Sequence, residues 1–471
     1  MMKHTHWRKA LIASLLASGA VLGAAQAADA PATLTPTQKS FRAIYQELIE
    51  INTTHSAGDT TRASEAMRAH LLAAGFKPDD VQVVAPFPRK GNLVARFKGS
   101  GKKKPLLLLA HIDVVEARRS DWDTDPFKLQ EKDGYFIARG AVDDKAMSAA
   151  FVSVLAQLKS EGFKPDRDII LALTGDEERG GEPTNGAFWI VNNRRELIEA
   201  EYGINEGGRG ENKDGKPVAH YVQLGEKSFV HAEFDATGPG GHSSRPMPDN
   251  VIYEVSEAMA RLKAYQFPVR VNEAARLHFE RSAALQTGQV ADDMRAVGKG
   301  SVDPAIIARL SANPGLVGLL RTTCVATMMS AGHAPNALAQ SAKATVNCRL
   351  LPDEDFAFVQ ARLTEIGGPK VKVVAQELSK PAPASAARPD VMAAVESISA
   401  SIWPGVPVIP TMGVSTTDSR HFRQNGIPMY GVSGMFGDDA NGVHGLNERI
   451  AVKDLYNGRE FLYQLVKRLA R

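Results

Sequence analysis

The pattern that most constrains this chain is a series of short apolar runs that alternate with helical segments. Residues 106–110 and 169–173 are continuous apolar runs, as expected of strands buried on both faces, and 202–205 is a third short strand. Apolar residues recur at helical spacing over 147–158, and a second helix is predicted over 187–199. This order predicts an α/β fold with a mostly parallel sheet and helices on both faces. Such sheets bind ligands beyond the carboxyl ends of their strands.

The α/β pattern is interrupted in the second half of the chain. Residues 228–236 alternate in polarity like an antiparallel strand with one exposed face. Helical segments and two further strands follow before the α/β pattern resumes, so we expect an inserted α+β domain. The expected divisions are a signal peptide at 1–27, the first part of the α/β domain at 28–225, the insertion at 226–380 and the second part at 381–471.

The first 27 residues have the organisation of a secretory signal peptide. Three basic residues precede an apolar stretch, and Ala25-Gln26-Ala27 is a small-residue cleavage site. Removing these three from the 56 lysines and arginines leaves 53, which equals the 53 aspartates and glutamates. We therefore expect an exported protein, in a bacterial periplasm, with no bulk charge for nucleic-acid binding and no membrane segment after cleavage. An uncleaved membrane anchor is the alternative for this segment.

Histidines and carboxylates follow the predicted strands, at the edge where such a sheet binds ligands. They are His111 with Asp113, Asp143 with Asp144, Glu177 with Glu178, Glu206, and His444 with Glu448. This mixture of nitrogen and carboxylate ligands suits zinc, and the number of acids would serve two ions that share a carboxylate. Each residue alone has an ordinary explanation, because an aspartate before a helix can cap it. Their joint occurrence at strand ends favours a metal site.

On these residues the chain resembles the M20 family of metallopeptidases and amidohydrolases. The segments that carry the resemblance, in the family's order, are 109–115, 140–145, 176–178, 206–208, 240–244 and 444–448. The resemblance implies a hydrolase with two zinc ions per chain, for which cobalt or manganese could substitute. It would cleave an amide bond adjacent to a free carboxylate in small peptides, as a carboxypeptidase or dipeptidase does. The alternatives are an N-acyl amino acid deacylase of the same family and a metal-free peptide-binding protein on the same fold.

The resemblance also gives each motif residue a role. Asp143 would bridge the two metals, and the full ligand set would be His111, Asp143, Glu178, Glu206 and His444. Asp113 would orient the ring of His111. Glu177 would be the general base that deprotonates the attacking water and later protonates the leaving amine.

The inserted domain resembles the family's lid. His242, in the sequence Gly-Gly-His-Ser-Ser, would stabilise the oxyanion of the tetrahedral intermediate. It would act from its own chain or from the partner in a homodimer formed through the lid. Asn336 and Arg349 match lid positions that reach the substrate, and Arg420 is a second candidate cation for the substrate's carboxylate. A salt bridge within the lid is the alternative for Arg349.

The chain has two cysteines, Cys324 and Cys348, one on each of two predicted lid strands. A hairpin centred near Asn336 would place them opposite one another. Export to an oxidising compartment allows a disulfide, whereas its strict geometry leaves two free thiols as the alternative.

Overall fold

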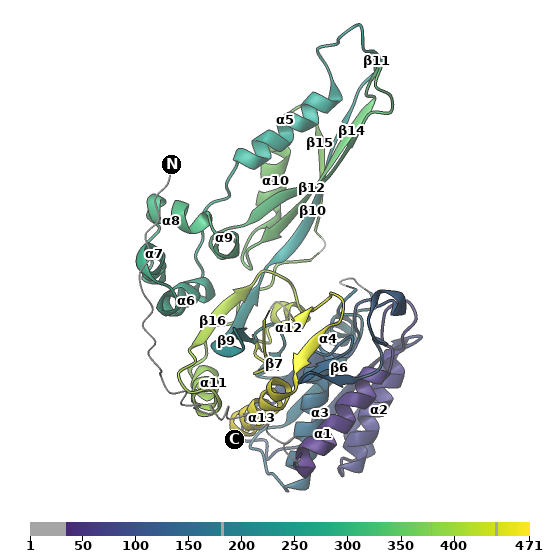
Figure 1. Ribbon diagram of the computed structural model, residues 1–471, viewed down its shortest axis with the longest axis vertical. Coiled ribbons are helices and arrows are strands. Elements are labelled where there is room, and N and C mark those ends of the chain that lie inside the picture. Colours follow the sequence, from purple (N-terminus) through teal and green to yellow (C-terminus); the bar gives the residue numbers. More distant parts are fainter. Residues whose placement is uncertain (1–33, 180–182, 378, 439–440) are drawn as a thin grey trace, which may run out of the picture.

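The computed structural model describes residues 34–179, 183–377, 379–438 and 441–471 (Figure 1). The predicted signal peptide at 1–27 lies outside the described residues. Among the helices described, none combines the length and the apolar character needed to cross a membrane.

A ten-stranded sheet forms the centre of the larger domain, in the order β1-β2-β6-β3-β7-β17-β9-β8-β18, with β16 paired to β9. Its central strands β6, β3, β7 and β17 are parallel. The strand bounds are β1 (Val81–Phe87), β2 (Lys90–Phe97), β3 (Leu106–His111), β6 (Ile169–Thr174), β7 (Tyr202–Asn205), β8 (Gly210–Lys213), β9 (Lys216–Glu226), β16 (Val408–Gly413), β17 (Met429–Gly431) and β18 (Phe436–Gly437). The predicted α/β class with a mainly parallel sheet is confirmed.

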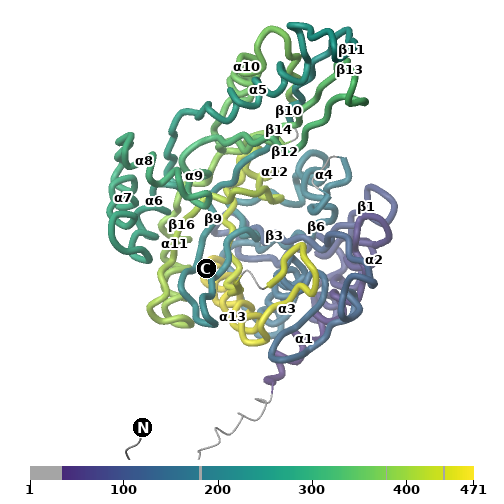
Figure 2. Tube along the Cα trace, turned by 45° about the horizontal axis from the view of Figure 1, so that its top comes forward, coloured from purple at the N-terminus to yellow at the C-terminus, as the bar shows by residue number. Residues whose placement is uncertain are grey.

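Helices cover both faces of this sheet, which explains why the central strands are apolar throughout. Along β3, Leu106 and Leu108 join the core cluster on one face, whereas Leu107 and Leu109 join the cluster on the other. The first face is covered by α1 (Pro36–Glu50), α2 (Thr60–Ala73), α3 (Lys145–Ser160), α11 (Pro389–Ile402) and α13 (Val452–Leu469). The second face is covered by α4 (Gly186–Asn193) and α12 (Ser419–Gln424). Figure 2 shows the C-terminal helix α13 beside α3, so the chain returns to the larger domain after the lid.

One predicted helix is shorter than expected. The sequence predicts a helix over 187–199, but α4 ends at Asn193 and a 3-10 turn follows at Arg195–Leu197. The amide side chains of Asn192 and Asn193 donate to the carbonyl oxygens of Phe188 and Trp189, at 2.8 and 2.9 Å. Asparagine favours helix ends because its side chain competes for backbone partners in this way.

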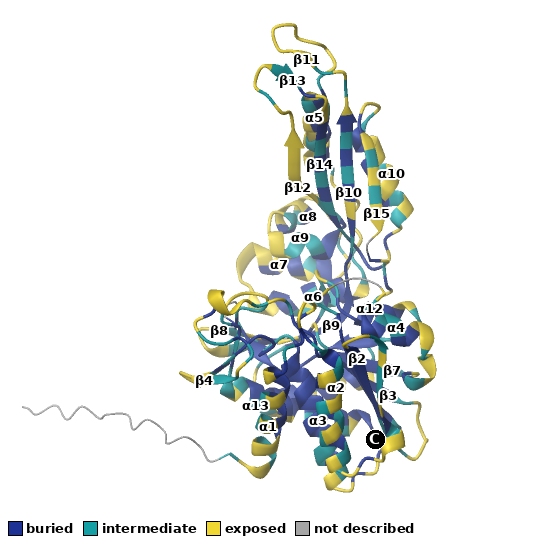
Figure 3. Ribbon diagram, turned by 90° about the vertical axis from the view of Figure 1, so that its right-hand side faces the viewer, coloured by how far each residue is buried: buried dark blue, intermediate teal, exposed yellow. Residues whose placement is uncertain are grey.

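The lid is a separate layer with its own hydrophobic core. Its antiparallel sheet has the order β12-β14-β10-β15, and α5 and α10 cover one face (Figures 1 and 3). The bounds are β10 (Ser228–Thr237), β12 (Thr323–Ala331), β14 (Ser341–Leu350), β15 (Lys372–Glu377), α5 (Val251–Ala264) and α10 (Phe356–Gly367). At the far end of the lid, β11 (Gly241–His242) pairs with β13 (Ala337–Leu338).

A helical segment of the predicted insertion packs against the larger domain. It comprises α6 (Glu273–Ser282), α7 (Gly288–Gly298), α8 (Pro304–Ser311) and α9 (Pro314–Leu320). Helix α6 lies against β16 and β9, and Phe279 is fully buried in the core of the larger domain. The stretch 226–380 therefore contributes to two different hydrophobic cores.

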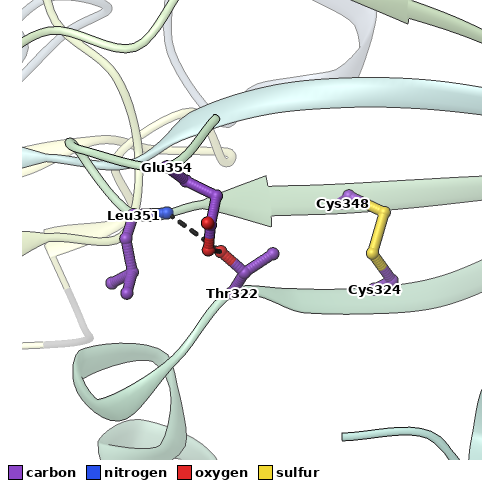
Figure 4. The surroundings of a disulfide bond; sticks show 5 residues. All are labelled: Thr322, Cys324, Cys348, Leu351 and Glu354. Atoms are coloured by element: carbon purple, nitrogen blue, oxygen red, sulfur yellow. Dashed lines mark hydrogen bonds between the residues drawn. A yellow bond between two sulfur atoms is a disulfide. The ribbon is translucent and has the colours of Figure 1, made fainter. Parts of the chain in front are cut away.

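A disulfide joins Cys324 and Cys348, which face each other across β12 and β14 (Figure 4). The disulfide is therefore confirmed, and the alternative of two free thiols is excluded. Nearby, the Thr322 hydroxyl donates to Glu354 at 2.7 Å and accepts from the Leu351 amide at 3.2 Å. The disulfide and these hydrogen bonds fasten the start of β12 to the end of β14.

Candidate metal centre

Five side chains predicted as metal ligands converge at the carboxyl edge of the central sheet. They form two groups that share one residue: His111, Asp143 and Glu206, and Asp143, Glu178 and His444. Within each group the potential ligand atoms all lie within 4.8 Å of one another. The strands explain this convergence, because His111 ends β3 and Glu206 directly follows the neighbouring parallel strand β7.

Asp143 lies between the two histidines, with one carboxylate oxygen toward each. Its Oδ1 is 3.0 Å from His111 Nε2, and its Oδ2 is 3.1 Å from His444 Nε2. Glu206 lies 3.9 Å from His111 Nε2, and Glu178 lies 2.9 Å from His444 Nε2. Two imidazoles and three carboxylates, one of them shared, form the donor set of a two-metal site, so the residues present fit a pair of divalent ions.

The electrostatics of this cluster also favour a metal ion. Hydrogen bonds to Asp143 and Glu178 raise the pKa of His444 to about 10. Burial and the nearby charge of Asp143 raise the pKa of Glu206 well above its usual range. In the absence of metal, His444 and Glu206 therefore retain protons at two ligand positions, and a divalent cation would replace these protons.

A buried ion pair positions the two loops that carry Asp143 and His444. Glu448, which is fully buried, accepts hydrogen bonds from the backbone amides of Gly140, Val142 and Asp143 at 2.7–3.0 Å. It also accepts a 2.8 Å bond from Arg139, whose second nitrogen donates to the Gly445 carbonyl at 2.8 Å. The Arg139–Glu448 pair thus ties the Asp143 loop to the His444 loop. The sequence motif contains Glu448, but its function in positioning the loops was not predicted.

Asp113 supports both His111 and the neighbouring loop. The Nδ1 atom of His111 lies 3.1 Å from the Asp113 carbonyl oxygen and 3.5 Å from its carboxylate. The two carboxylate oxygens of Asp113 accept the backbone amides of Glu177 and Glu178, both at 3.1 Å. Asp113 therefore fixes the ring of one histidine and the backbone of the predicted base at the same time.

Glu177 directly precedes the metal ligand Glu178, and its side chain is partly buried. Burial raises its pKa well above the ordinary value for a glutamate, and the nearby carboxylates of Asp418 and Glu178 add to the shift. Asp176, which precedes it, has a left-handed backbone with φ of 61° and accepts a 2.6 Å hydrogen bond from Lys90. A carboxyl group whose pKa is raised by its surroundings is a better proton acceptor than an ordinary glutamate, as a general base requires.

The lid residues predicted to reach the substrate fall into two places. His242 is exposed at the far end of the lid, and the adjacent Ser243 amide donates to the Asn336 carbonyl at 3.1 Å (Figure 1). His242 and Asn336 are therefore close to each other but far from the metal ligands of their own chain. Arg349, by contrast, lies at the base of the lid with its guanidinium over the Phe229 ring, and it forms no ion pair with any described residue.

Two basic residues near the base of the lid are buried. Arg420, predicted to bind the substrate's carboxylate, is only 6% exposed and donates to the ring of His421. Lys227, which sequence reasoning missed, donates to the Arg321 carbonyl at 2.7 Å, and burial lowers its pKa to about 7. Its position at the junction of β9 and β10 could have drawn attention to it.

The fold and the donor set define the class: a two-metal hydrolase built on a mainly parallel sheet with a lid. The family described as Peptidase family M20/M25/M40 matches residues 107–468, and the chain belongs to this family.

Several relatives cover most of the chain. A probable carboxypeptidase S-like 2 from Dictyostelium discoideum is 30% identical over 80% of this chain and 74% of its own length. The mouse N-fatty-acyl-amino acid synthase/hydrolase PM20D1 is 27% identical over 77% of this chain and 74% of its own length. Among solved structures, an M20 family metallo-carboxypeptidase from Sulfolobus solfataricus shares the fold, with a TM-score of 0.67, 20% identity, and coverage of 91% of this chain and 99% of the other.

Proposed function

We propose that this enzyme hydrolyses an amide bond adjacent to a free carboxylate, in a small peptide or an N-acyl amino acid. The observation that carries the proposal is the placement of Asp143 between two histidines, with Glu177 held in the loop that also bears Glu178. His111, Asp143 and Glu206 would hold one zinc ion, and Asp143, Glu178 and His444 the other. Two such ions supply polarisation of the scissile carbonyl and acidification of a water molecule.

The chain's own residues handle the proton. Glu177 would accept it at a carboxylate oxygen as the water attacks, and would deliver it to the nitrogen of the leaving amine. Its raised pKa supports this exchange, because burial makes the carboxylate a stronger proton acceptor than an ordinary glutamate. Arg349 would bind the carboxylate of the leaving half, since a guanidinium without an acidic partner is free to pair with one.

We further propose that the active unit is a homodimer formed through the lid, in which His242 serves the partner's site. Its remoteness from its own metal ligands supports this arrangement (Figure 1). The outer strand β12 pairs on one side only among the strands that the structure describes, and it exposes three apolar side chains, Val325, Met328 and Met329, at 58%, 70% and 51% (Figure 3). An exposed edge of this kind pairs readily with another chain.

Export to a periplasm is also part of the proposal. The expected cleavage after Ala27 would place the protein where disulfides form, and the Cys324–Cys348 disulfide supports such a compartment. Mass analysis of the mature N-terminus in an expressing bacterium tests the cleavage, which predicts Ala28 as the first residue.

The test of the proposed function is metal analysis combined with a substrate panel. The purified protein should contain about two metal ions per chain and should cleave dipeptides or N-acyl amino acids. A chelator should abolish cleavage, and added zinc should restore it. Two bound ions without any cleavage on the panel would contradict the proposed substrate class. A protein that takes up no metal but binds peptides would instead support the binding-protein alternative.

A second candidate, the N-acyl amino acid deacylase, is favoured by one specific observation. The mouse relative that is 27% identical over 77% of this chain is named an N-fatty-acyl-amino acid synthase/hydrolase.

A further inference from the structure

The loop that carries Glu177 has a left-handed residue at its centre. The loop follows β6, and Asp176 within it has a backbone φ of 61°, a conformation that few residues other than glycine adopt. Hydrogen bonds hold the backbone on both sides of Asp176. The Gly175 amide donates to the Asn92 side chain at 2.9 Å, and the Glu177 amide donates to the Asp113 carboxylate at 3.1 Å. The direction of the Glu177 side chain therefore depends on what keeps Asp176 in this conformation.

Asp176 forms a buried ion pair with Lys90. The two side chains meet because β2 runs antiparallel to β6, so Lys90 at the start of β2 lies beside the residues that follow β6. Lys90 Nζ donates to Asp176 Oδ1 at 2.6 Å, and the two residues are 8% and 0% exposed. Without Lys90, a fully buried carboxylate would lose its nearest counter-charge at the centre of the loop.

The ammonium group of Lys90 has no donor left for a substrate. Besides its bond to Asp176, its nitrogen lies 3.1 Å from Nδ1 of His55 and donates to the His55 carbonyl oxygen at 3.5 Å. These three contacts occupy its three N–H groups, and none of them goes to a candidate metal ligand. Lys90 therefore acts on the site through the loop that it holds.

We propose that Lys90 is a positioning residue for the general base. Its ion pair with Asp176 keeps the loop in the conformation that directs Glu177 toward the attacking water. This inference rests on the proposed function, in which Glu177 accepts a proton from that water. Loss of the pair would misdirect the Glu177 carboxylate, and a misplacement of about 1 Å can lower a rate about 10²-fold.

The first test compares Lys90→Met with a matched control at the other end of β6. Arg167 lies just before β6, is 3% exposed and pairs with Glu201 at 2.8 Å. The six residues of β6 span about 20 Å, so Arg167→Gln breaks a buried pair far from Glu177. Both variants should lose stability in urea denaturation. Only Lys90→Met should lose kcat, about 10²-fold on the best substrate of the panel, with KM within about threefold of wild type.

Metal content and a conservative variant separate the base from the metal ligands. Lys90→Met should retain about two metal ions per chain, and excess zinc should not restore its kcat. Lys90→Arg keeps the charge and the donor, so its kcat should exceed that of Lys90→Met at least tenfold. Recovery with zinc would assign the effect to the metal ligand Glu178 and overturn the proposal. Equal kcat in Lys90→Met and Arg167→Gln would also overturn it, because Lys90 would then only stabilise the fold.

The second test asks whether Lys90 acts through Asp176. Asp176→Asn removes the charge but keeps a residue type that tolerates a left-handed backbone. Either single substitution breaks the same pair, so the variant that combines Lys90→Met with Asp176→Asn should have a kcat within about twofold of Lys90→Met. Losses that multiply in the combined variant would mean that the two residues act independently, against the proposal.

The third test does not require hydrolysis. In the metal-free protein, Lys90→Met should speed hydrogen exchange of the amides over 175–178 at least tenfold, because their bonds to Asn92 and Asp113 depend on the loop conformation. Arg167→Gln should leave this exchange within about twofold of wild type. Equal exchange in Lys90→Met and wild type would overturn the proposal. Faster exchange in Lys90→Met, with a wild type that hydrolyses no member of the panel, would contradict the proposed function but not the hold of Lys90 on the loop.

Discussion

The buried carboxylate of Glu448 allows a sharp test of how the metal centre is built. Its two oxygens accept four hydrogen bonds, three from backbone amides of the Asp143 loop and one from Arg139. Glu448→Gln keeps the size of the side chain but replaces one acceptor oxygen with a donor nitrogen. One pair of these donors would then lose its partner, because the amide nitrogen of glutamine cannot accept a hydrogen bond.

The magnitude follows from burial. Arg139 and Glu448 are 2% and 0% exposed, so the guanidinium would remain in the interior without its counter-charge. Breaking a buried ion pair by removing one partner costs about 3–5 kcal/mol. This is a large fraction of the total of about 5–15 kcal/mol that stabilises a typical folded domain. The Asp143 loop would also lose its anchor, and loss of such supporting contacts lowers metal affinity about 10–100-fold.

Two measurements separate these effects. Urea denaturation of the metal-free protein gives the change in unfolding free energy, and competition with a chromophoric chelator gives zinc affinity. The matched control is Glu226→Gln, because Glu226 pairs with Arg423 at 3.0 Å, both side chains are buried, and the hydrogen bonds of Glu226 go to Gln223, Thr417 and Arg423 rather than to a metal ligand. It should lose similar stability but retain zinc affinity within about threefold.

The reasoning would be refuted by a Glu448→Gln protein whose zinc affinity matches that of Glu226→Gln at equal loss of stability. The carboxylate would then be a general stabiliser of the fold, with no particular effect on the metal loops.

Four further predictions concern other residues. Glu177→Gln should retain about two metal ions per chain but lose several orders of magnitude in kcat, and a small loss would mean that Glu177 is not the base. His242→Ala should lose about 10²–10³ in kcat through the missing oxyanion contact, and mixing it with Glu177→Gln should recover activity only if a site is shared between subunits. Lys227→Met should be more stable than wild type below about pH 7. Burial lowers the pKa of this lysine from 10.5 to about 7, so below pH 7 the wild-type protein must bury a charged lysine when it folds. The gain in unfolding free energy, roughly 2–5 kcal/mol, should fade between pH 7 and 10.5 in urea denaturation curves. Cys324→Ala with Cys348→Ala should lower the unfolding free energy of the lid by about 2–4 kcal/mol, and an unchanged value in non-reducing buffer would contradict a stabilising disulfide.

The strands and the ligand cluster could be predicted because local patterns encode them. The apolar runs at 106–110 and 169–173 are buried on both faces, as their composition requires, and a parallel sheet aligns their carboxyl ends. Any polar residue that directly follows such a strand must lie near its equivalents on neighbouring strands. The order of the strands alone therefore predicts that His111 and Glu206 lie close together.

The placement of the lid residues could not be predicted in this way. The pairing of Cys324 with Cys348 follows from a local hairpin, but the distance from His242 to the metal ligands depends on the orientation of one domain relative to another. The packing of the helices over 273–320 could not be predicted for the same reason. An amphipathic pattern indicates that one face is buried, but it does not indicate which core buries it, and here Phe279 enters the core of the larger domain.

Arg420 illustrates a different limit. Its type and its position beside the family loop predict a cation for the substrate, and this stays a prediction. The sequence does not indicate how far the side chain is buried, whereas the structure shows it in α12 with 6% exposed. Sequence shows a charged residue but not the direction in which a six-residue helix projects it. The function of Glu448 in positioning the loops could not be predicted either. The sequence shows an acid four residues after His444, but only the folded loops show that three backbone amides surround its carboxylate.

The structure separates the chemistry of the site from the choice of substrate. The metal ligands are fixed by buried contacts within the larger domain, such as those of Asp113 and Glu448. The proposed carboxylate contact, Arg349, belongs to the lid and makes none of those hydrogen bonds. Substitutions at Arg349 should therefore change which amide is cleaved while leaving zinc affinity intact. Glu448→Gln should instead lower zinc affinity, and with it the cleavage of every substrate alike. A family can in this way keep one hydrolytic centre while its members diverge in what they hydrolyse.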